Sequence, residues 1–105
     1  MKNIAKKILI INMKYHIPVD ILAKDFMALA DPISKVAGLE WKIWLHDVEK
    51  KVAGGVYLFK DDKSVKNYLN GPIVAGIMKY KGVSDIDAKV FDVLPEHSKV
   101  TRGPL

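Results

Sequence analysis

Four side chains that could act on a small molecule lie within apolar segments of the sequence, namely Asn12, Trp44, His46 and Tyr57. An amide and a phenol can donate a hydrogen bond to a ligand oxygen, and a histidine, with a pKa of about 6.5, can move a proton at neutral pH. An indole ring can form a wall of an aromatic pocket. Each residue also has a structural interpretation, as a hydrogen-bonded amide, a core aromatic side chain or an exposed hairpin histidine.

A second group of residues could line a binding site, namely Tyr68, Gly71, Ile73 and Ile77. They belong to the segment NYLNGPIVAGIMKY (67–80), which has the apolar spacing of a helix but contains Gly71-Pro72. Because a proline inside a helix costs about 3 kcal/mol, we predict two short helices with a break at 70–72. Gly71 would end the first helix, and Pro72 would lie in the first turn of the second. Small side chains at this break either allow close packing on a sheet or leave room for a ligand.

The histidines and glycines of the chain do not have the spacing of a metal or nucleotide site. His16, His46 and His97 are far apart in the sequence, and the chain has no cysteine. The glycine pair in AGGVYLF (53–59) falls within a predicted strand, not between a strand and a helix, so it is not a phosphate-binding loop. We therefore expect neither a metal nor another cofactor.

The charge of the chain is basic but not organised for nucleic acid. The net charge is +5 and the pI is about 9.4, yet Arg102 is the single arginine, and the lysines are interleaved with acidic residues. This pattern favours solvated surface charge over an anionic partner, so we expect no nucleic acid. Residues 1–15 lack a cleavage site, and no apolar run approaches the ~20 residues of a membrane span. We expect a soluble, cytoplasmic protein without membrane contact.

Apolar periodicity predicts one domain over residues 1–93, followed by an extended tail at 94–105. Pro32 is expected to end or kink the first helix, which would begin at Ile21. The capping residues that we predict are Asp20, Gly38, Asp61 or Asp62, and Gly82. The predicted strands are 7–15, 39–47, 52–60 and 85–93, and the predicted helical segments lie between the first two strands and between the last two.

The order of these elements is β-α-β-β-α-β, which is typical of the ferredoxin-like α+β fold with a four-stranded antiparallel sheet. Two helical segments can cover only one face of such a sheet, yet both faces of the predicted strands carry large apolar side chains. Trp41 and Trp44 show this, because they point to opposite faces of one strand. One of them could line a pocket and the other an interface, with core packing as the alternative. We therefore predict a homodimer that pairs through its sheet faces.

Four segments resemble, in order and spacing, the YdhR-like family of monooxygenases. They are GLEWKIW (38–44), AGGVYLF (53–59), KSVKNYLNGPIVAG (63–76) and DAKVFDV (87–93). The resemblance implies the dimeric α+β barrel, in which the second helical segment forms the roof of a pocket. The wider superfamily includes cofactor-independent monooxygenases of aromatic polyketides and haem-degrading enzymes. The latter carry a histidine iron ligand on the second helix, and because 63–81 contains none, we do not expect haem.

The resemblance also implies a function. It indicates a cofactor-independent monooxygenase that acts on a small aromatic, phenol- or quinol-like substrate held between sheet and helices. By its position on the first strand, Asn12 resembles the asparagine with which superfamily oxygenases hold a substrate oxygen. The alternative is a non-catalytic homodimer that binds a small hydrophobic molecule, which the weakness of each catalytic candidate supports.

Overall fold

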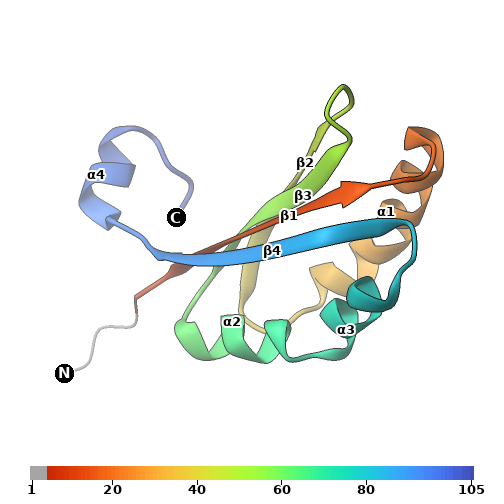
Figure 1. Ribbon diagram of the computed structural model, residues 1–105. Helices are drawn as coiled ribbons and strands as arrows, with labels where there is room; N and C mark the ends of the chain where they lie inside the picture. The colour runs from red at the N-terminus through yellow and green to blue at the C-terminus, as the bar shows by residue number, and fades with distance from the viewer. Residues whose placement is uncertain (1–4) are drawn as a thin grey trace.

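A computed structural model describes residues 5–105 and shows four strands and four helices (Figure 1). Residues 1–4, at the start of the predicted domain, lie outside this description. The elements in chain order are β1 (Lys7–Tyr15), α1 (Val19–Ser34), β2 (Leu39–Asp47), β3 (Val52–Phe59), α2 (Asp62–Leu69), α3 (Pro72–Lys79), β4 (Val83–Asp92) and α4 (Pro95–Val100).

The four strands form one sheet in the order β2-β3-β1-β4, and every neighbouring pair is antiparallel. With α1 between the first two strands and α2 and α3 between the last two, this is the ferredoxin-like arrangement that the sequence predicts. The predicted bounds of the first two strands agree with the structure, and the other two differ by at most two residues at an end.

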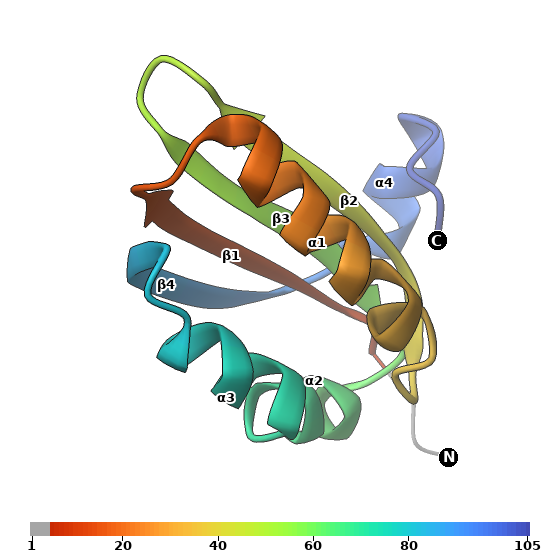
Figure 2. The same ribbon diagram turned by 90° about the vertical axis from the view of Figure 1, so that its right-hand side faces the viewer.

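The helices α1, α2 and α3 all lie on one face of the sheet, with α1 beside the α2–α3 pair (Figure 2). The alternation of β1 explains which face they cover. Leu9, Ile11 and Met13 are buried on the covered face, while Asn12 and Lys14, on either side of Met13, are exposed. Leu22 and Ile33 of α1 and Val65 of α2 complete this core from above the sheet.

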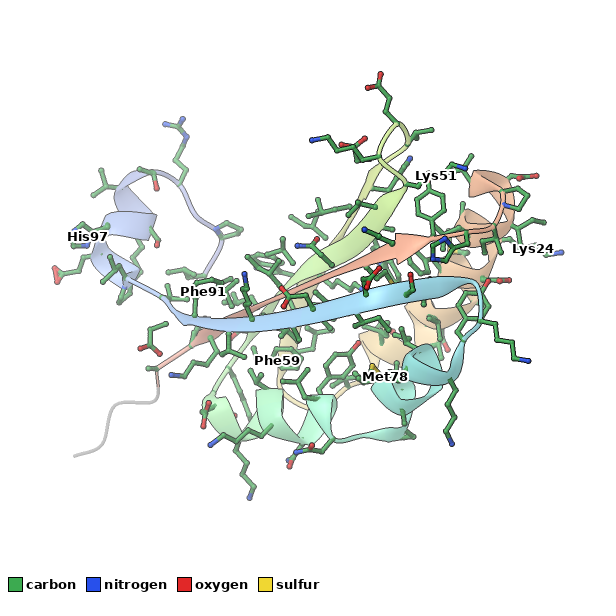
Figure 3. All side chains as sticks on the ribbon, viewed as in Figure 1. Lys24, Lys51, Phe59, Met78, Phe91 and His97 are labelled. Carbon is green, nitrogen blue, oxygen red and sulfur yellow. The ribbon has the colours of Figure 1, made fainter. Side chains whose placement is uncertain are left out.

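The other face of the sheet, which we call the open face, keeps apolar side chains in contact with solvent. Ile43 is 54% exposed, Phe91 49% and Leu45 43%. Figure 3 shows the contrast between two phenylalanines, because Phe59 lies on the side of the helices and Phe91 on the opposite side. The prediction that both faces carry large apolar groups is therefore confirmed.

The first helix begins and ends differently from the prediction. Pro18 precedes it, and the Pro18 carbonyl accepts the first hydrogen bonds, from the Ile21 and Leu22 amides at 3.1 and 3.0 Å. Asp20 therefore lies in the first turn instead of capping the helix. Pro32 does not end the helix, which continues to Ser34, although the missing N–H of the proline removes one backbone hydrogen bond.

The prediction that Gly38 closes α1 is also wrong. The helix ends at Ser34, and Gly38 lies in the following loop with a φ of +85°. A Cβ at this position would stand 2.1 Å from the Ser64 Oγ atom, so glycine allows this loop to touch the start of α2.

The prediction of an extended C-terminal tail is wrong for part of its length, because residues 95–100 form α4. A proline in its first turn favours this short helix. Figure 1 shows α4 apart from the other helices, with the end of the chain folding back toward the sheet. There the Trp41 Nε1 atom donates a hydrogen bond of 2.7 Å to the carbonyl oxygen of Pro104. The tail thus covers one end of the open face.

Candidate functional site

A cleft of about 390 Å³ lies between α1 and α3, above the sheet. Its walls are mainly apolar, with Phe26 and Leu29 from α1 facing Ile73 and Ile77 from α3. Gly76 lines the same cleft, and a Cβ built there would have no neighbour within 4 Å. The volume is in the range of known small-ligand pockets, about 300–1,000 Å³.

The break between α2 and α3 is what shapes one side of this cleft. The Asp61 carboxylate caps α2 by accepting a 2.9 Å hydrogen bond from the Ser64 amide. Hydrogen bonding from the Ser64 side chain, and then from this amide, lowers the pKa of Asp61. Asn70 ends α2, and Gly71 then precedes Pro72 at the first turn of α3. The predicted break beside a cavity is confirmed, although Gly71 caps the start of α3 rather than the end of α2.

The floor of the cleft is a small cavity of about 10 Å³ beneath α1 and α3, which we call the floor cavity. Trp44 and Tyr57 line it from β2 and β3, and Ile77 lines it from α3. Phe26 separates it from the cleft and packs on Trp44, with ring centroids 5.2 Å apart. Three of the predicted site residues therefore come together here.

Lys42 also lines the floor cavity, and the sequence analysis did not select it. Its Nζ atom lies 3.3 Å from the centroid of the Trp44 ring and 4.5 Å from that of Tyr57. Burial, which disfavours the charged amine, lowers the pKa of Lys42 to about 7. A signal was present in the sequence, because Lys42 and Trp44 are two positions apart on β2 and therefore point to the same face of the sheet.

Tyr57 and Tyr68 form a buried pair next to the floor cavity. Their hydroxyl oxygens are 3.0 Å apart, and their ring centroids are 5.2 Å apart. Burial raises the pKa of both phenols, so both stay neutral at physiological pH. The pair has two hydroxyl protons for one mutual hydrogen bond, so the accepting phenol retains a proton for another acceptor.

A polar contact joins the two walls of the cleft at Asp25 and Tyr80. The Tyr80 hydroxyl donates a hydrogen bond to the Asp25 carboxylate, and this contact raises the pKa of Tyr80 to about 12. Both residues line the cleft, Asp25 from α1 and Tyr80 from the end of α3. They therefore hold the two helices at a fixed separation on this side of the cleft.

The remaining predicted residues lie outside the floor cavity. His46 lines a separate groove of about 330 Å³ between α1 and β2, and it is exposed. Gly71 and Tyr68 line a third hollow, beside α2. Asn12 and Trp41 point to the open face, where Asn12 is exposed and Trp41 binds the tail. The structure thus separates Asn12 from Trp44 and Tyr57 by the thickness of the sheet.

Residues 5–105 contain no group of three or more His, Asp or Glu side chains that could hold a metal ion. Neither α2 nor α3 carries a histidine that could bind a haem iron from the roof of the cleft. In the same described range, no helix is long and apolar enough to cross a membrane.

The fold and the cleft define a class of protein, a ferredoxin-like α+β domain with a ligand-sized apolar pocket between its sheet and helices. The sequence model of the family described as "Putative mono-oxygenase ydhR" matches residues 8–104. The chain therefore belongs to this family. No curated protein matches the sequence.

Solved structures of similar fold come from several bacteria. A protein of unknown function from Nitrosomonas europaea has a TM-score of 0.70 and 21% identity, covering 89% of this chain and 93% of that one. SnoaB, a cofactor-independent oxygenase from Streptomyces nogalater, has a TM-score of 0.71 and 11% identity, with coverage of 86% and 94%. The heme-degrader MhuD from Mycobacterium tuberculosis has a TM-score of 0.65 and 18% identity, covering 84% of this chain and 95% of that one. At these identities the likeness establishes the fold alone.

Proposed function

We propose that this protein is a cofactor-independent monooxygenase that oxidises a small phenol- or quinol-like aromatic molecule. The observation that carries the proposal is the apolar cleft of about 390 Å³ between α1 and α3, which narrows onto the aromatic side chains of the floor cavity. Membership of the monooxygenase family and the fold shared with SnoaB support the same reaction class.

The proposed reaction needs few groups from the protein. A deprotonated, electron-rich aromatic substrate gives electrons directly to O₂; one oxygen atom stays in the product, and the other leaves as water. The protein must bind the ring, favour its anion and exclude bulk water. Phe26 and Trp44 supply aromatic walls, and the Tyr57–Tyr68 pair supplies a phenolic proton near the floor cavity.

We also propose that two chains pair through their open faces. Ile43, Leu45 and Phe91 are each more than 40% exposed on this face. A monomer gains nothing by leaving such side chains in water, whereas a second copy of the face would bury them. Pairing would place the two clefts on the outer sides of the dimer, so each chain would keep its own cleft.

A second function is favoured by the small number of polar groups in the cleft. The Asp25–Tyr80 contact aside, its lining is apolar, and the proposed catalytic residues Asn12 and His46 lie elsewhere. This arrangement also suits a non-catalytic homodimer that binds a small hydrophobic molecule. It differs from the oxygenase in one measurable respect, because it binds aromatic ligands without consuming oxygen.

Oxygen uptake tests the choice between the two functions. The purified protein would be mixed with a panel of anthrones and hydroquinones, with an oxygen electrode for turnover and calorimetry for binding. Uptake above the spontaneous rate, with one oxygen atom from ¹⁸O₂ in the product, is the result expected of the oxygenase. Binding without uptake across the panel would select the binding protein, and neither binding nor uptake would contradict both.

A further inference from the structure

Lys42 occupies an unusual place for a lysine. It lies on the covered face of the sheet, and its stem runs over Gly55 of the neighbouring strand. A Cβ built on Gly55 would stand 2.6 Å from the Lys42 Cε atom and 3.6 Å from Cγ. A glycine at this position of β3 therefore makes the space in which the lysine stem lies. Among the described residues that line the floor cavity, Lys42 is the only one with a basic side chain.

The amine of Lys42 has no carboxylate partner within ion-pair distance among residues 5–105. Glu40, two positions earlier on β2, binds the Lys6 amine at 2.9 Å. Asp25, on the opposing helix, accepts a hydrogen bond from the Tyr80 hydroxyl. The other titratable groups facing this region are the neutral phenols of Tyr57 and Tyr68 and, farther along β2, the exposed His46. The part of the chain that the structure describes thus places an amine in an apolar site without providing an anion for it.

The surroundings of the amine accommodate both of its protonation states. Burial favours the neutral amine, and the resulting pKa of about 7 leaves a large fraction of it unprotonated at neutral pH. The faces of the Trp44 and Tyr57 rings, at 3.3 and 4.5 Å, attract the ammonium form. A group that takes up a proton and later releases it requires such a balance.

We propose that Lys42 is the base that deprotonates a phenolic ligand of the cleft and is then the counter-ion of its phenolate. This assignment rests on the proposed binding of an aromatic molecule between α1 and α3, and it specifies the class of that molecule as an aromatic with an acidic hydroxyl. In the step itself, the O–H bond of the phenol breaks, its electron pair stays on oxygen, and the proton forms a fourth bond to the Lys42 nitrogen. An ammonium–phenolate pair results.

The amine is separated from the cleft by side chains that line both the cleft and the floor cavity. Met13, Phe26, Leu29 and Ile77 line both the cleft and the floor cavity, so these four side chains separate Nζ from a ligand. The proposed contact therefore requires these side chains to move aside, and the flexible four-carbon stem of lysine would then carry Nζ to the hydroxyl of the ligand. The phenolate is the electron-rich form that can reduce O₂, so the same contact would prepare the substrate for the proposed oxidation.

The test uses 4-nitrophenol, whose phenol and phenolate forms absorb at different wavelengths, and 4-nitroanisole, which has no acidic proton. The wild type, Lys42→Met and the matched control Lys24→Met, which removes an exposed lysine of α1 (Figure 3), would be titrated at pH 6. We expect the wild type and Lys24→Met to bind 4-nitrophenol as the phenolate. Lys42→Met should bind it at least tenfold more weakly, and as the phenol, with 4-nitroanisole binding unchanged.

The outcomes separate the role of Lys42 from the function on which it rests. If the wild type binds both ligands but Lys42→Met still produces the phenolate spectrum, the assignment of Lys42 is wrong and the aromatic cleft stands. If the wild type binds neither ligand, the aromatic cleft is wrong, and the assignment is lost with it.

A second measurement needs no ligand. Carbon-13 NMR of protein labelled at lysine Cε would show one resonance, absent from Lys42→Met, that titrates near neutral pH. A Lys42 resonance that titrates together with the surface lysines, above pH 10, would overturn the proposal.

Discussion

The two faces of the sheet are unusual in opposite ways, since one buries a polar group and the other exposes apolar ones. The covered face places an amine, Lys42, among buried apolar side chains, whereas the open face leaves Ile43 and Phe91 about half exposed to water. A buried amine without a carboxylate costs free energy, and so does an exposed apolar patch on a stable monomer. In the single chain, the covered face therefore lacks an anion for its amine, and the open face lacks a cover for its apolar side chains. The chemistry of each face indicates the kind of partner that it would bind.

The difference between the faces concerns the size and chemistry of the missing partner. The covered face offers a cleft between two helices with one amine below it, which suits a small acidic aromatic molecule. The open face is broad and carries exposed apolar groups from β2 and β4, which suits a protein surface of the same kind. One sheet can thus separate ligand binding from assembly, with only its backbone shared between the two.

The largest expected effect comes from a charge on the open face. Ile43→Asp should convert a dimer into a monomer of 11.8 kDa and raise the dimer dissociation constant by about 100-fold or more, because two carboxylates would be buried in the interface. Light scattering after size exclusion measures this mass. Met78→Asp, at an exposed position of α3, is the matched control and should stay dimeric. A wild type that is already monomeric at micromolar concentration contradicts the pairing.

The second effect acts on the covered face and depends on pH. The unfolded chain keeps a proton on Lys42 up to the ordinary pKa of 10.5, whereas the folded chain releases it near 7. Unfolding therefore takes up a proton between these values, and the free energy of unfolding contributed by Lys42 rises with pH across this window. Lys42→Met removes the penalty, so it should stabilise the protein by about 2 kcal/mol at pH 6, allowing for partial exposure.

Urea denaturation of the wild type and Lys42→Met at pH 6 and at pH 10 measures this difference. The stability gap should narrow at the higher pH, and Lys24→Met should show no such change. A gap that is equal at both pH values, or a Lys42→Met variant that is less stable at pH 6, would show that the amine is not desolvated in the folded chain.

The fold could be predicted from the sequence because the strand alternation and the helix-breaking residues are local signals. The departures have local causes as well. The Pro18 carbonyl, rather than the side chain of Asp20, receives the first hydrogen bonds of the helix, and the helix continues for two residues past Pro32. The six-residue α4 is shorter than any apolar period can reveal.

The candidate site could be predicted only in part. Trp44 and Tyr57 meet at the floor cavity because strand alternation fixes their faces once one face is known to be covered, and Ile77 joins them from α3. The sequence does not say which face that is, since both are apolar, and the structure shows Asn12 exposed on the opposite side of the sheet from Trp44. Lys42 is not among the predicted residues because a lysine in a strand is usually solvated, so the face that it shares with Trp44 does not by itself indicate burial, whereas its packing over Gly55 does.

A smaller effect concerns the tyrosine pair beneath the helices. Tyr57→Phe and Tyr68→Phe should each lower the free energy of unfolding by about 1–2 kcal/mol, because each leaves one buried hydroxyl without its partner at 3.0 Å. The double variant should lose less than the sum of the two, since no unpaired hydroxyl remains. Urea denaturation of all four proteins gives the coupling energy, and strict additivity would mean that the hydroxyls do not interact.

The smallest effect distinguishes stability from ligand binding within the cleft itself. Gly76 lies in the middle of α3, and a Cβ built there meets no atom within 4 Å. Gly76→Ala should therefore raise the free energy of unfolding by about 0.5–1 kcal/mol, because alanine favours the helix and no contact opposes it. The added methyl group occupies the cleft, so the same variant should bind 4-nitroanisole a few-fold more weakly. Ala75→Ser, an exposed change on the same helix outside the cleft, is the control and should leave binding unaltered. A more stable Gly76→Ala protein with unchanged affinity for 4-nitroanisole would mean that the ligand does not lie between α1 and α3. This conclusion would hold whether or not two chains pair through their open faces.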